Sequence, residues 1–257
     1  MWNFVVKYFS FYYNQNMKTI LITGASGGIG SEIAKKFAKS NNNIILVYNK
    51  NKKTVQNMKQ TFKNCHLEIF QCDLKNTEQV NAMVAKIIKN HKKIDCLINC
   101  AGISKYQQIQ DTTDADYYEV FDTNLKSTIM LTSAVSKHMI SEHYGKIVNI
   151  SSMWGVVGAS MESLYSASKG AINNLTRSLA KELGPSNINV NAICPGLIDT
   201  KMNKTLSPET IIDLVDNTPL TRIGQPADIA NAVEFLCSDK ANFITGQILT
   251  IDGGFSL

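Results

Sequence analysis

Short apolar runs rich in β-branched residues alternate along the chain with longer segments whose apolar residues recur at helical spacing. The strand-like runs cover residues 19–23, 44–48, 67–71, 96–99, 146–150, 188–193 and 247–251. The helical segments between them are roughly 12 to 25 residues long, as expected for helices that connect parallel strands. Right-handed connections then produce a doubly wound sheet with helices on both faces. The pattern therefore predicts an α/β protein built on a seven-stranded parallel sheet.

The chain divides into one large domain and a short N-terminal extension. Its 257 residues can enclose one well-buried core, and no Pro/Gly/Ser-rich linker interrupts them, so residues 17–257 are assigned to a single domain. Residues 1–16 are rich in aromatic side chains, but they are too short to span a bilayer and lack a signal-peptide pattern. Met17 directly precedes the first strand, which favours a start codon assigned too early over an interfacial anchor. Peptides from residues 1–16 in the natively expressed protein would contradict that interpretation.

Composition argues against several classes of function. Hydrophobic residues make up 44% of the chain and charged residues 18%, as in an ordinary soluble protein. The net charge is +5, but the lysines are spread along predicted helices, which favours solvated helix faces over nucleic-acid binding. Six cysteines without C-x-x-C spacing indicate reduced, buried thiols, and the four histidines lie outside every motif below. We therefore expect a cytoplasmic protein with no metal site, no Ser-His-Asp triad and no membrane partner.

The first strand-like run ends in a glycine-rich turn, T-G-A-S-G-G-I-G, at residues 23–30. Glycines at these positions let the backbone turn sharply and approach a pyrophosphate, while the amides of the following helix donate hydrogen bonds to it. The position of the turn after the first strand favours a Rossmann dinucleotide site over a tight turn without a ligand. We assign cofactor contacts in this turn to Gly24, Ser26, Gly28, Ile29 and Gly30.

The residues after the second strand favour the phosphorylated form of the cofactor. An NAD enzyme usually presents a carboxylate here to the adenosine ribose, whereas this chain has Asn49 and Lys50, followed by Lys52 and Lys53. A lysine-rich turn without a carboxylate accepts a 2′-phosphate, so NADP(H) is favoured over NAD(H), with contacts from Asn49 and Lys50. The alternative is that these lysines are only solvated loop residues.

Tyr165 and Lys169 stand four residues apart in a predicted helix, downstream of Ser152. At this spacing the two side chains share one helix face, so the ammonium lies beside the phenol and favours its ionised form. A phenol held in this way can donate and accept a proton near neutral pH. Such pairs are also common as plain surface contacts, with the lysine stem on the ring, so the remaining motifs decide between the two interpretations.

Taken together, these motifs resemble the short-chain dehydrogenase/reductase family from Lys18 to Leu257. Besides the glycine-rich turn, the chain matches the family at Asp73, in an N-C-A-G turn at residues 99–102, and in the Y-S-A-S-K segment. One departure is Cys100, which replaces the family's second Asn and is expected to alter packing behind the cofactor. The resemblance implies further cofactor contacts by Asp73, Leu74, Asn99, Ala101, Gly102, Tyr165, Lys169, Pro195, Gly196, Ile198 and Thr200.

The resemblance also implies catalytic roles for four residues. Ser152 would hydrogen-bond the substrate carbonyl, and Tyr165 would donate its proton. Lys169 would bind the nicotinamide ribose and lower the pKa of Tyr165, and Asn124 would hold a water molecule in a proton relay. Ketone reduction needs the developing alkoxide to be stabilised and then protonated, which two hydroxyl groups on one oxygen can do. A non-catalytic dinucleotide sensor is the alternative of another class, and the intact catalytic residues argue against it.

Two segments bear on the identity of the ketone. The sequence R-I-G-Q-P-A-D-I-A at residues 222–230 resembles the bacterial 3-oxoacyl-acyl-carrier-protein reductases of fatty-acid synthesis. The segment W-G-V-V-G-A-S-M-E at residues 154–162 is instead similar to the reductases that act on a 5-aminopentanone group on a lysine of elongation factor P. That group ends in an ammonium, which Glu162 could pair with. The alternative is that Glu162 is solvated or caps a helix. The resemblance implies substrate contacts by Ser152, Trp154 and Glu162, with elongation factor P favoured over acyl carrier protein as the partner.

Residues 197–219 are predicted to form a helical lid over the substrate. The resemblance implies a homotetramer assembled through the helices after the fourth and fifth strands and through the C-terminal strand. A dimer is the alternative, because the apolar stripe at residues 164–183 also fits a helix packed within one chain.

Overall fold

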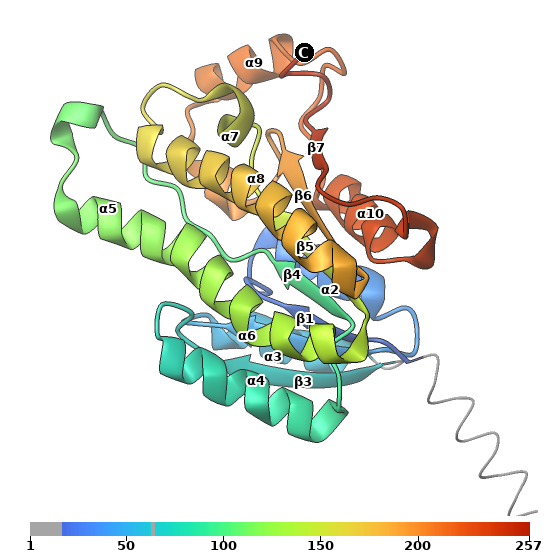
Figure 1. The fold of residues 1–257 in the computed structure, drawn as a ribbon. Helices are drawn as coiled ribbons and strands as arrows, with labels where there is room; N and C mark the ends of the chain where they lie inside the picture. Colours follow the sequence, from blue (N-terminus) through green and yellow to red (C-terminus); the bar gives the residue numbers. More distant parts are fainter. Residues whose placement is uncertain (1–16, 63–64) are drawn as a thin grey trace, which may run out of the picture.

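The computed structural model describes residues 17–62 and 65–257. Its strands form one parallel sheet in the order β3-β2-β1-β4-β5-β6-β7 (Figure 1). The strands are β1 (Thr19–Ile22), β2 (Asn43–Tyr48), β3 (His66–Gln71), β4 (Cys96–Asn99), β5 (Gly145–Ile150), β6 (Ile188–Pro195) and β7 (Ile248–Ile251). The predicted fold class is confirmed. The strand order reverses between β1 and β4, which is where a doubly wound sheet binds its ligand.

Helices cover both faces of the sheet (Figure 1). They are α2 (Gly28–Phe37), α3 (Lys52–Thr61), α4 (Thr77–His91), α5 (Asp114–Phe121), α6 (Ser127–Glu142), α7 (Trp154–Val157), α8 (Ser163–Leu183), α9 (Pro208–Asp216) and α10 (Pro226–Leu236). Buried residues of α2, α3 and α10 form one core, and those of α4, α6 and α8 form a second core on the opposite face. The sheet is therefore shielded from water on both sides.

Strand β1 shows why the strands appear in the sequence as continuous apolar runs. Successive side chains of a strand point to opposite faces. Ile20 and Ile22 accordingly join the core with α2 and α10, whereas Leu21 joins the core with α4 and α6. All three are fully buried, because helices cover both faces.

The predicted lid segment is helical. It contains the 3₁₀ turn η4 (Lys201–Thr205) and helix α9. The Ser207 side chain accepts a hydrogen bond from the Thr210 amide at 3.2 Å, and Pro208 occupies the first turn, so the start of α9 has a favourable cap. No residue of α9 is buried, which leaves this helix on the surface above the sheet.

The predicted extension, residues 1–16, lies outside the described residues. Within the described ranges, no helix is long and apolar enough to cross a membrane. The same ranges contain no cluster of three or more His, Cys, Asp or Glu side chains placed to hold a metal ion. All six cysteines are free thiols, of which Cys65 and Cys100 are half-buried and the others buried.

Candidate active site

The glycine-rich turn between β1 and α2 is closed too tightly for larger residues. A Cβ atom on Gly30 would lie 2.4 Å from the carbonyl oxygen of Gly24. A Cβ on Gly24, where φ is +62°, would lie 2.7 Å from the carbonyl oxygen of Cys100. Glycine is therefore required at both positions, by space at Gly30 and by space and conformation at Gly24. The turn thus lies directly against the residues that follow β4.

The start of α2 fits the pyrophosphate of a dinucleotide. Its N-cap is Gly27, so no side chain caps the helix, and the first turn contains no acidic residue. The amides at a helix N-terminus have no acceptor within the helix, and the helix dipole there favours negative charge. Gly28 also lies against Thr200, since a Cβ on Gly28 would approach the Thr200 methyl group to 2.7 Å. Gly28 and Thr200, which are predicted cofactor contacts after β1 and β6, therefore lie next to each other.

Thr23 connects the ends of β1 and β4. Its hydroxyl oxygen accepts hydrogen bonds from the amides of Cys100 and Ala101, at 3.0 and 3.1 Å. Cys100 packs against the core that contains α2, and burial raises the pKa of its thiol to about 11. The thiol is therefore neutral at physiological pH and acts as packing, as predicted for this departure from the family pattern.

The end of β2 presents amide and ammonium groups rather than carboxylates. Asn49 and Lys50 are exposed directly after the strand, and the first turn of α3 contains no acidic residue. Asp73, after β3, accepts a hydrogen bond from the Lys75 amide at 3.1 Å, so its carboxylate is partly engaged in a local turn. Within the described ranges, Lys50 forms no ion pair, which leaves its charge available to an anion.

Ser152, Tyr165 and Lys169 meet at the carboxyl end of β5. Their exposed fractions are 6%, 9% and 4%. The hydroxyl groups of Ser152 and Tyr165 are within hydrogen-bonding reach of each other. The ammonium of Lys169 lies over the Tyr165 ring, 5.6 Å from its centroid, and donates to the carbonyl of Ile150 at 2.8 Å. These three of the four predicted catalytic residues therefore form one buried cluster.

The pKa of Tyr165 departs from the sequence-based expectation. Burial raises it well above its usual value, the hydrogen bond with Ser152 lowers it by less, and the negative charge of Glu162 raises it further. Burial therefore dominates the pKa of Tyr165, and the lowering of this pKa by Lys169 stays a prediction. Burial also lowers the pKa of Lys169 to about 8, so this lysine can lose its proton near neutral pH.

Asn124 lies in a π-helical turn, η2 (Asp122–Lys126), between α5 and α6. Its side chain accepts a hydrogen bond from the Ile103 amide at 2.8 Å. It also donates to the Ile103 carbonyl at 2.9 Å and to the Ser168 hydroxyl at 3.0 Å. Both amide hydrogens are thus engaged, and the side chain fixes the loop that follows β4. A relay water would have to be held by the Asn124 main-chain carbonyl, which accepts from Thr128.

Glu162 lies at the start of α8 without capping it. The helix has no side-chain cap hydrogen bond from this residue. The half-buried carboxylate instead accepts a hydrogen bond from the Ser104 hydroxyl at 2.5 Å, and burial raises its pKa. Helix capping, one of the alternatives for Glu162, is therefore wrong. The carboxylate is close enough to Tyr165 to influence the pKa of the phenol.

Comparison with known proteins agrees with this geometry. A sequence profile of a family described as enoyl-(acyl carrier protein) reductase matches residues 24–256. The chain belongs to the short-chain dehydrogenase/reductase family. The oxidoreductase YmfI of Bacillus subtilis is 39% identical over 242 residues, which cover 93% of this chain and 98% of that protein. The 3-oxoacyl-[acyl-carrier-protein] reductase FabG of Staphylococcus aureus is 35% identical over 239 residues, 92% of this chain and 97% of FabG.

A solved structure extends the similarity to the whole fold. The crystal structure of a gluconate dehydrogenase candidate from Agrobacterium tumefaciens has a TM-score of 0.87 and 31% identity, covering 93% of this chain and 96% of that one. The relatives are named for different substrates. Membership in the short-chain dehydrogenase/reductase family therefore establishes an oxidoreductase acting on C=O or CH–OH groups with a nicotinamide cofactor, without determining the substrate.

Asn99, a predicted cofactor contact, has a side chain that forms hydrogen bonds within the protein. Its side-chain nitrogen donates to the Thr132 hydroxyl at 3.1 Å and to the side-chain amide oxygen of Asn149 at 2.9 Å. Asn149 in turn donates to the Thr176 hydroxyl at 2.9 Å. These four buried polar groups link β4, β5, α6 and α8. The side-chain nitrogen of Asn99 is thus part of the scaffold of this short-chain reductase.

Asn99→Ala is expected to destabilise the protein without weakening cofactor binding. The substitution leaves buried partners unsatisfied, which costs about 2–3 kcal/mol of unfolding free energy. Urea unfolding should show this loss, while the NADPH dissociation constant should change by less than about twofold, a difference of about 0.4 kcal/mol. Asn149→Ala, one step further along the same hydrogen-bonded chain, serves as the matched control. Weaker NADPH binding in Asn99→Ala alone would contradict this assignment.

Lys169→Met is expected to stabilise the cofactor-free protein while removing activity. The pKa of Lys169 is lower in the folded protein than in the unfolded chain, so its contribution to stability rises with pH between about 8 and 10.5. Below pH 8 the buried charge destabilises the fold. After allowing for the lost hydrogen bond to Ile150, we expect a gain of about 1–2 kcal/mol at pH 7.

That gain should shrink as the pH approaches 10.5, because the folded lysine is then neutral and the unfolded one is losing its proton as well. Urea unfolding of wild type and variant at pH 7 and pH 10 measures it. Lys181→Met, at an exposed position on the same helix, should show no such pH dependence. An equal stability difference at both pH values would contradict the prediction.

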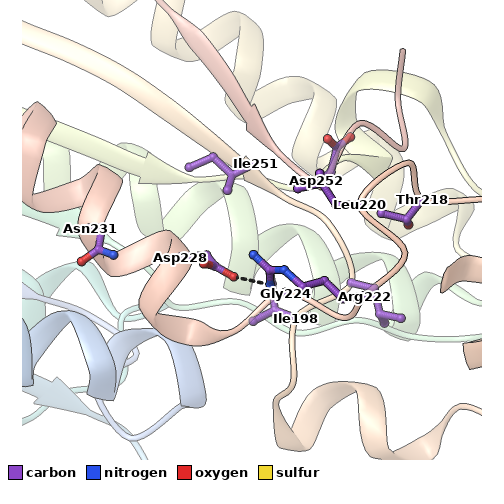
Figure 2. A pocket seen from close by; sticks show the side chains of 11 residues that line it. Ile198, Thr218, Leu220, Arg222, Gly224, Asp228, Asn231, Ile251 and Asp252 are labelled. Atoms are coloured by element: carbon purple, nitrogen blue, oxygen red, sulfur yellow. Dashed lines mark hydrogen bonds and ion pairs between the residues drawn. The ribbon is translucent and has the colours of Figure 1, made fainter.

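A separate pocket is lined in part by residues 197–198, which follow β6. Ile198, Leu220, Arg222, Asp228 and Asp252 are among its lining residues, and Figure 2 shows the ion pair between Arg222 and Asp228. None of the predicted catalytic residues of the reductase lines this pocket. It adjoins the cofactor region at Ile198, whose backbone is bridged to Gly224.

Proposed function

We propose that the protein is an NADPH-dependent ketone reductase that acts on the 5-aminopentanone group carried by a lysine of elongation factor P. The observation that carries the proposal is the half-buried Glu162 carboxylate beside Tyr165. A carboxylate at this distance from the proton donor can pair with a cationic group at the end of a short substrate chain. An acyl chain on an anionic phosphopantetheine would gain nothing from it.

The chemistry at the carbonyl follows from the two hydroxyl groups. The bound nicotinamide cofactor supplies the hydride. Ser152 and Tyr165 donate hydrogen bonds to the substrate oxygen, which stabilises the developing alkoxide, and Tyr165 then transfers its proton. Lys169 lies over the ring and favours the ionised phenol when the lysine is protonated. The Asn124 carbonyl would hold the water that returns a proton towards Lys169.

Ser104 supports the role proposed for Glu162. Its hydroxyl donates to one oxygen of the carboxylate and so holds the charge in place. Ser104 belongs to the loop after β4, which Asn124 fixes through Ile103. The carboxylate is therefore held from two sides, by the start of α8 and by this loop. A preorganised anion loses little entropy when it pairs with a substrate ammonium.

The preference for NADP(H) rests on the end of β2. Asn49 and Lys50 occupy the position where a carboxylate would select NAD(H), and Lys52 and Lys53 begin α3. Three ammonium groups close to one strand end favour a 2′-phosphate electrostatically. The ratio of NADPH to NADH turnover by the purified protein measures this preference directly.

Reduction of 3-oxoacyl groups on acyl carrier protein is the second candidate function. It is favoured by the identity to FabG over nearly the whole chain. The same catalytic residues would serve either substrate, so the difference must arise at the rim of the pocket. A role as a dinucleotide sensor is disfavoured, because Ser152, Tyr165 and Lys169 are present in one buried cluster and Asn124 is also retained.

We also propose a cytoplasmic homotetramer. Phe243 and Leu249 are exposed beside the edge strand β7, and Tyr118 is exposed on α5. Exposed apolar side chains on two separate surfaces are typical of a protein that forms two kinds of subunit contact. Light scattering after gel filtration distinguishes a tetramer from a dimer.

The decisive experiment compares two substrates in one assay. Consumption of NADPH and of NADH is followed with elongation factor P bearing the 5-aminopentanone group and, in parallel, with an acetoacetyl thioester of acyl carrier protein. We expect kcat/KM to be at least about tenfold higher for modified elongation factor P, a difference of about 1.4 kcal/mol. A higher value for the thioester would overturn the proposal and assign the enzyme to fatty-acid synthesis.

A further inference from the structure

The chain ends in a tight turn immediately after β7. The Asp252 carboxylate accepts hydrogen bonds from the amides of Gly254 and Ser256, at 3.0 and 2.9 Å. Gly253 and Gly254 have φ values of +69° and +93°, which residues other than glycine rarely adopt. The turn therefore has one well-defined shape, and that shape determines where Phe255 lies.

This C-terminal turn, residues 252–255, contacts the ends of two other segments. The Gly253 carbonyl accepts a hydrogen bond from the Leu220 amide at 3.1 Å, just beyond α9. A Cβ on Gly196, in the turn after β6, would lie 2.6 Å from the Asp252 Cα. Figure 2 shows Asp252 beside Leu220 and Thr218 at the pocket wall. The turn is thus held on two sides by the protein.

On its third side the turn reaches the catalytic residues through two aromatic rings. Phe255 packs edge-on against Trp154, with ring centroids 5.4 Å apart and planes at 83°. The Trp154 amide donates a hydrogen bond to the Ser152 hydroxyl oxygen at 3.2 Å. One residue therefore separates the C-terminal ring from the hydroxyl that binds the substrate oxygen.

Helix α7, which begins with Trp154, is short and partly exposed. It is a single turn of four residues, and Val156 and Val157 are 50% and 52% exposed. A helix this short has almost no stability of its own, so its position depends on tertiary contacts. Helix α8 supplies some of these contacts, since the Asn173 side chain donates to the Gly155 carbonyl at 2.9 Å, and the Phe255 ring supplies another at Trp154.

We propose that Phe255 is a positioning residue for catalysis, which acts by holding Trp154 so that the Trp154 amide orients the Ser152 hydroxyl. The amide occupies an acceptor site on the serine oxygen, which leaves the serine proton free to point at the phenol or at the substrate carbonyl. Small displacements of such a donor reduce the rate strongly, because transition-state stabilisation depends on alignment. The inference rests on ketone reduction by Ser152 and Tyr165, and it holds for any ketone that the enzyme reduces.

The test compares substitutions at Phe255 in the full-length enzyme with any ketone that wild type reduces. Phe255→Ala should lower kcat about tenfold while the NADPH dissociation constant stays unchanged, and Phe255→Tyr, which keeps the ring, should restore most of the rate. Leu257→Ala is the matched control, since this apolar side chain in the same tail is fully exposed. A kcat for Phe255→Ala equal to that of wild type would overturn the proposal. If Phe255→Ala does not fold, Phe255→Leu replaces it.

A double-mutant cycle separates this mechanism from an effect through the lid. If Phe255 acts through Trp154, Phe255→Ala should cause no further loss in a Trp154→Ala background. A second tenfold loss in that background would contradict the proposal.

Fluorescence provides a readout that does not depend on activity. The chain has two tryptophans, so Trp2→Phe leaves Trp154 as the single fluorophore. Phe255→Ala should then increase acrylamide quenching of Trp154, and unchanged quenching would overturn the inference. A wild type that reduces no ketone would instead refute the proposed function, with the fluorescence test still deciding this one.

Discussion

Tyr165→Phe is expected to lower kcat for ketone reduction by about 10²- to 10⁴-fold, the range that a positioned general acid contributes. The substitution removes the hydroxyl that protonates the substrate oxygen and keeps the ring. The ring's contact with the Lys169 ammonium, 5.6 Å from the centroid, should therefore survive. Pre-steady-state NADPH oxidation measures the rate, and quenching of NADPH fluorescence should show that the dissociation constant for NADPH changes little.

Tyr144→Phe is the matched control for this experiment. It removes a phenol hydroxyl that contacts Asp239 near the opposite end of β5, and it should leave kcat within about twofold of wild type. If Tyr165→Phe reduced the ketone as fast as wild type, the assignment of Tyr165 as proton donor would be refuted. The dinucleotide-sensor hypothesis would then regain support.

Glu162→Gln is expected to affect the two candidate substrates differently. At an effective dielectric constant of about 20, opposite unit charges about 4 Å apart attract by about 4 kcal/mol. Solvent screening at a half-buried site reduces this to about 1.4–2.7 kcal/mol, a factor of about 10–100 in kcat/KM. We expect that loss for the ammonium-bearing 5-aminopentanone and less than about a threefold change for an acetoacetyl thioester, because the latter has no cation to pair with.

Two variants sharpen this comparison. Glu182→Gln removes an exposed carboxylate from the same helix and should change neither substrate. Ser104→Ala keeps the charge of Glu162 but removes its hydrogen bond, so it should cause a smaller loss in the same direction. Equal losses for both substrates in Glu162→Gln would indicate that this carboxylate has a structural role only.

The pH dependence provides a further check on Glu162. Burial raises the pKa of this carboxyl above the usual value for Glu, so it becomes protonated at a higher pH than an exposed Glu. Neutral Glu162 no longer attracts an ammonium. The preference for the amine-bearing substrate should therefore decline as the pH falls, and this decline should be absent in Glu162→Gln.

The fold could be predicted from local patterns because both faces of a doubly wound sheet are buried. Ile20, Leu21 and Ile22 are all apolar since each face of β1 meets a layer of helices. The glycine-rich turn was equally readable. Gly24 has a positive φ and Gly30 has no room for a side chain, so each of these positions requires glycine by itself.

The catalytic group could be predicted because its members carry recognisable motifs in a set order. Tyr165 and Lys169 are one helical turn apart, so their proximity follows from sequence spacing alone. The approach of Ser152 to Tyr165 depends on the end of β5 meeting α8, which the motif order implies but local periodicity does not.

Other features depend on contacts between residues far apart in the chain. The Asn99 side-chain nitrogen donates to Thr132 and Asn149, because buried polar groups at neighbouring positions satisfy one another. Burial likewise raises the pKa of Tyr165, and the depth of that burial cannot be inferred from the spacing of Tyr165 and Lys169.

The sequence by itself determined the class of fold and the glycine-rich turn, and it predicted the reacting groups, because each depends on periodicity or on residues close together in the chain. Only the tertiary structure decided that Ser104 holds Glu162 and that Phe255 supports Trp154. Both pairs join residues that lie more than 50 positions apart in the chain. Their contacts exist because the ends of parallel strands converge at one edge of the sheet, where loops from distant parts of the chain pack together.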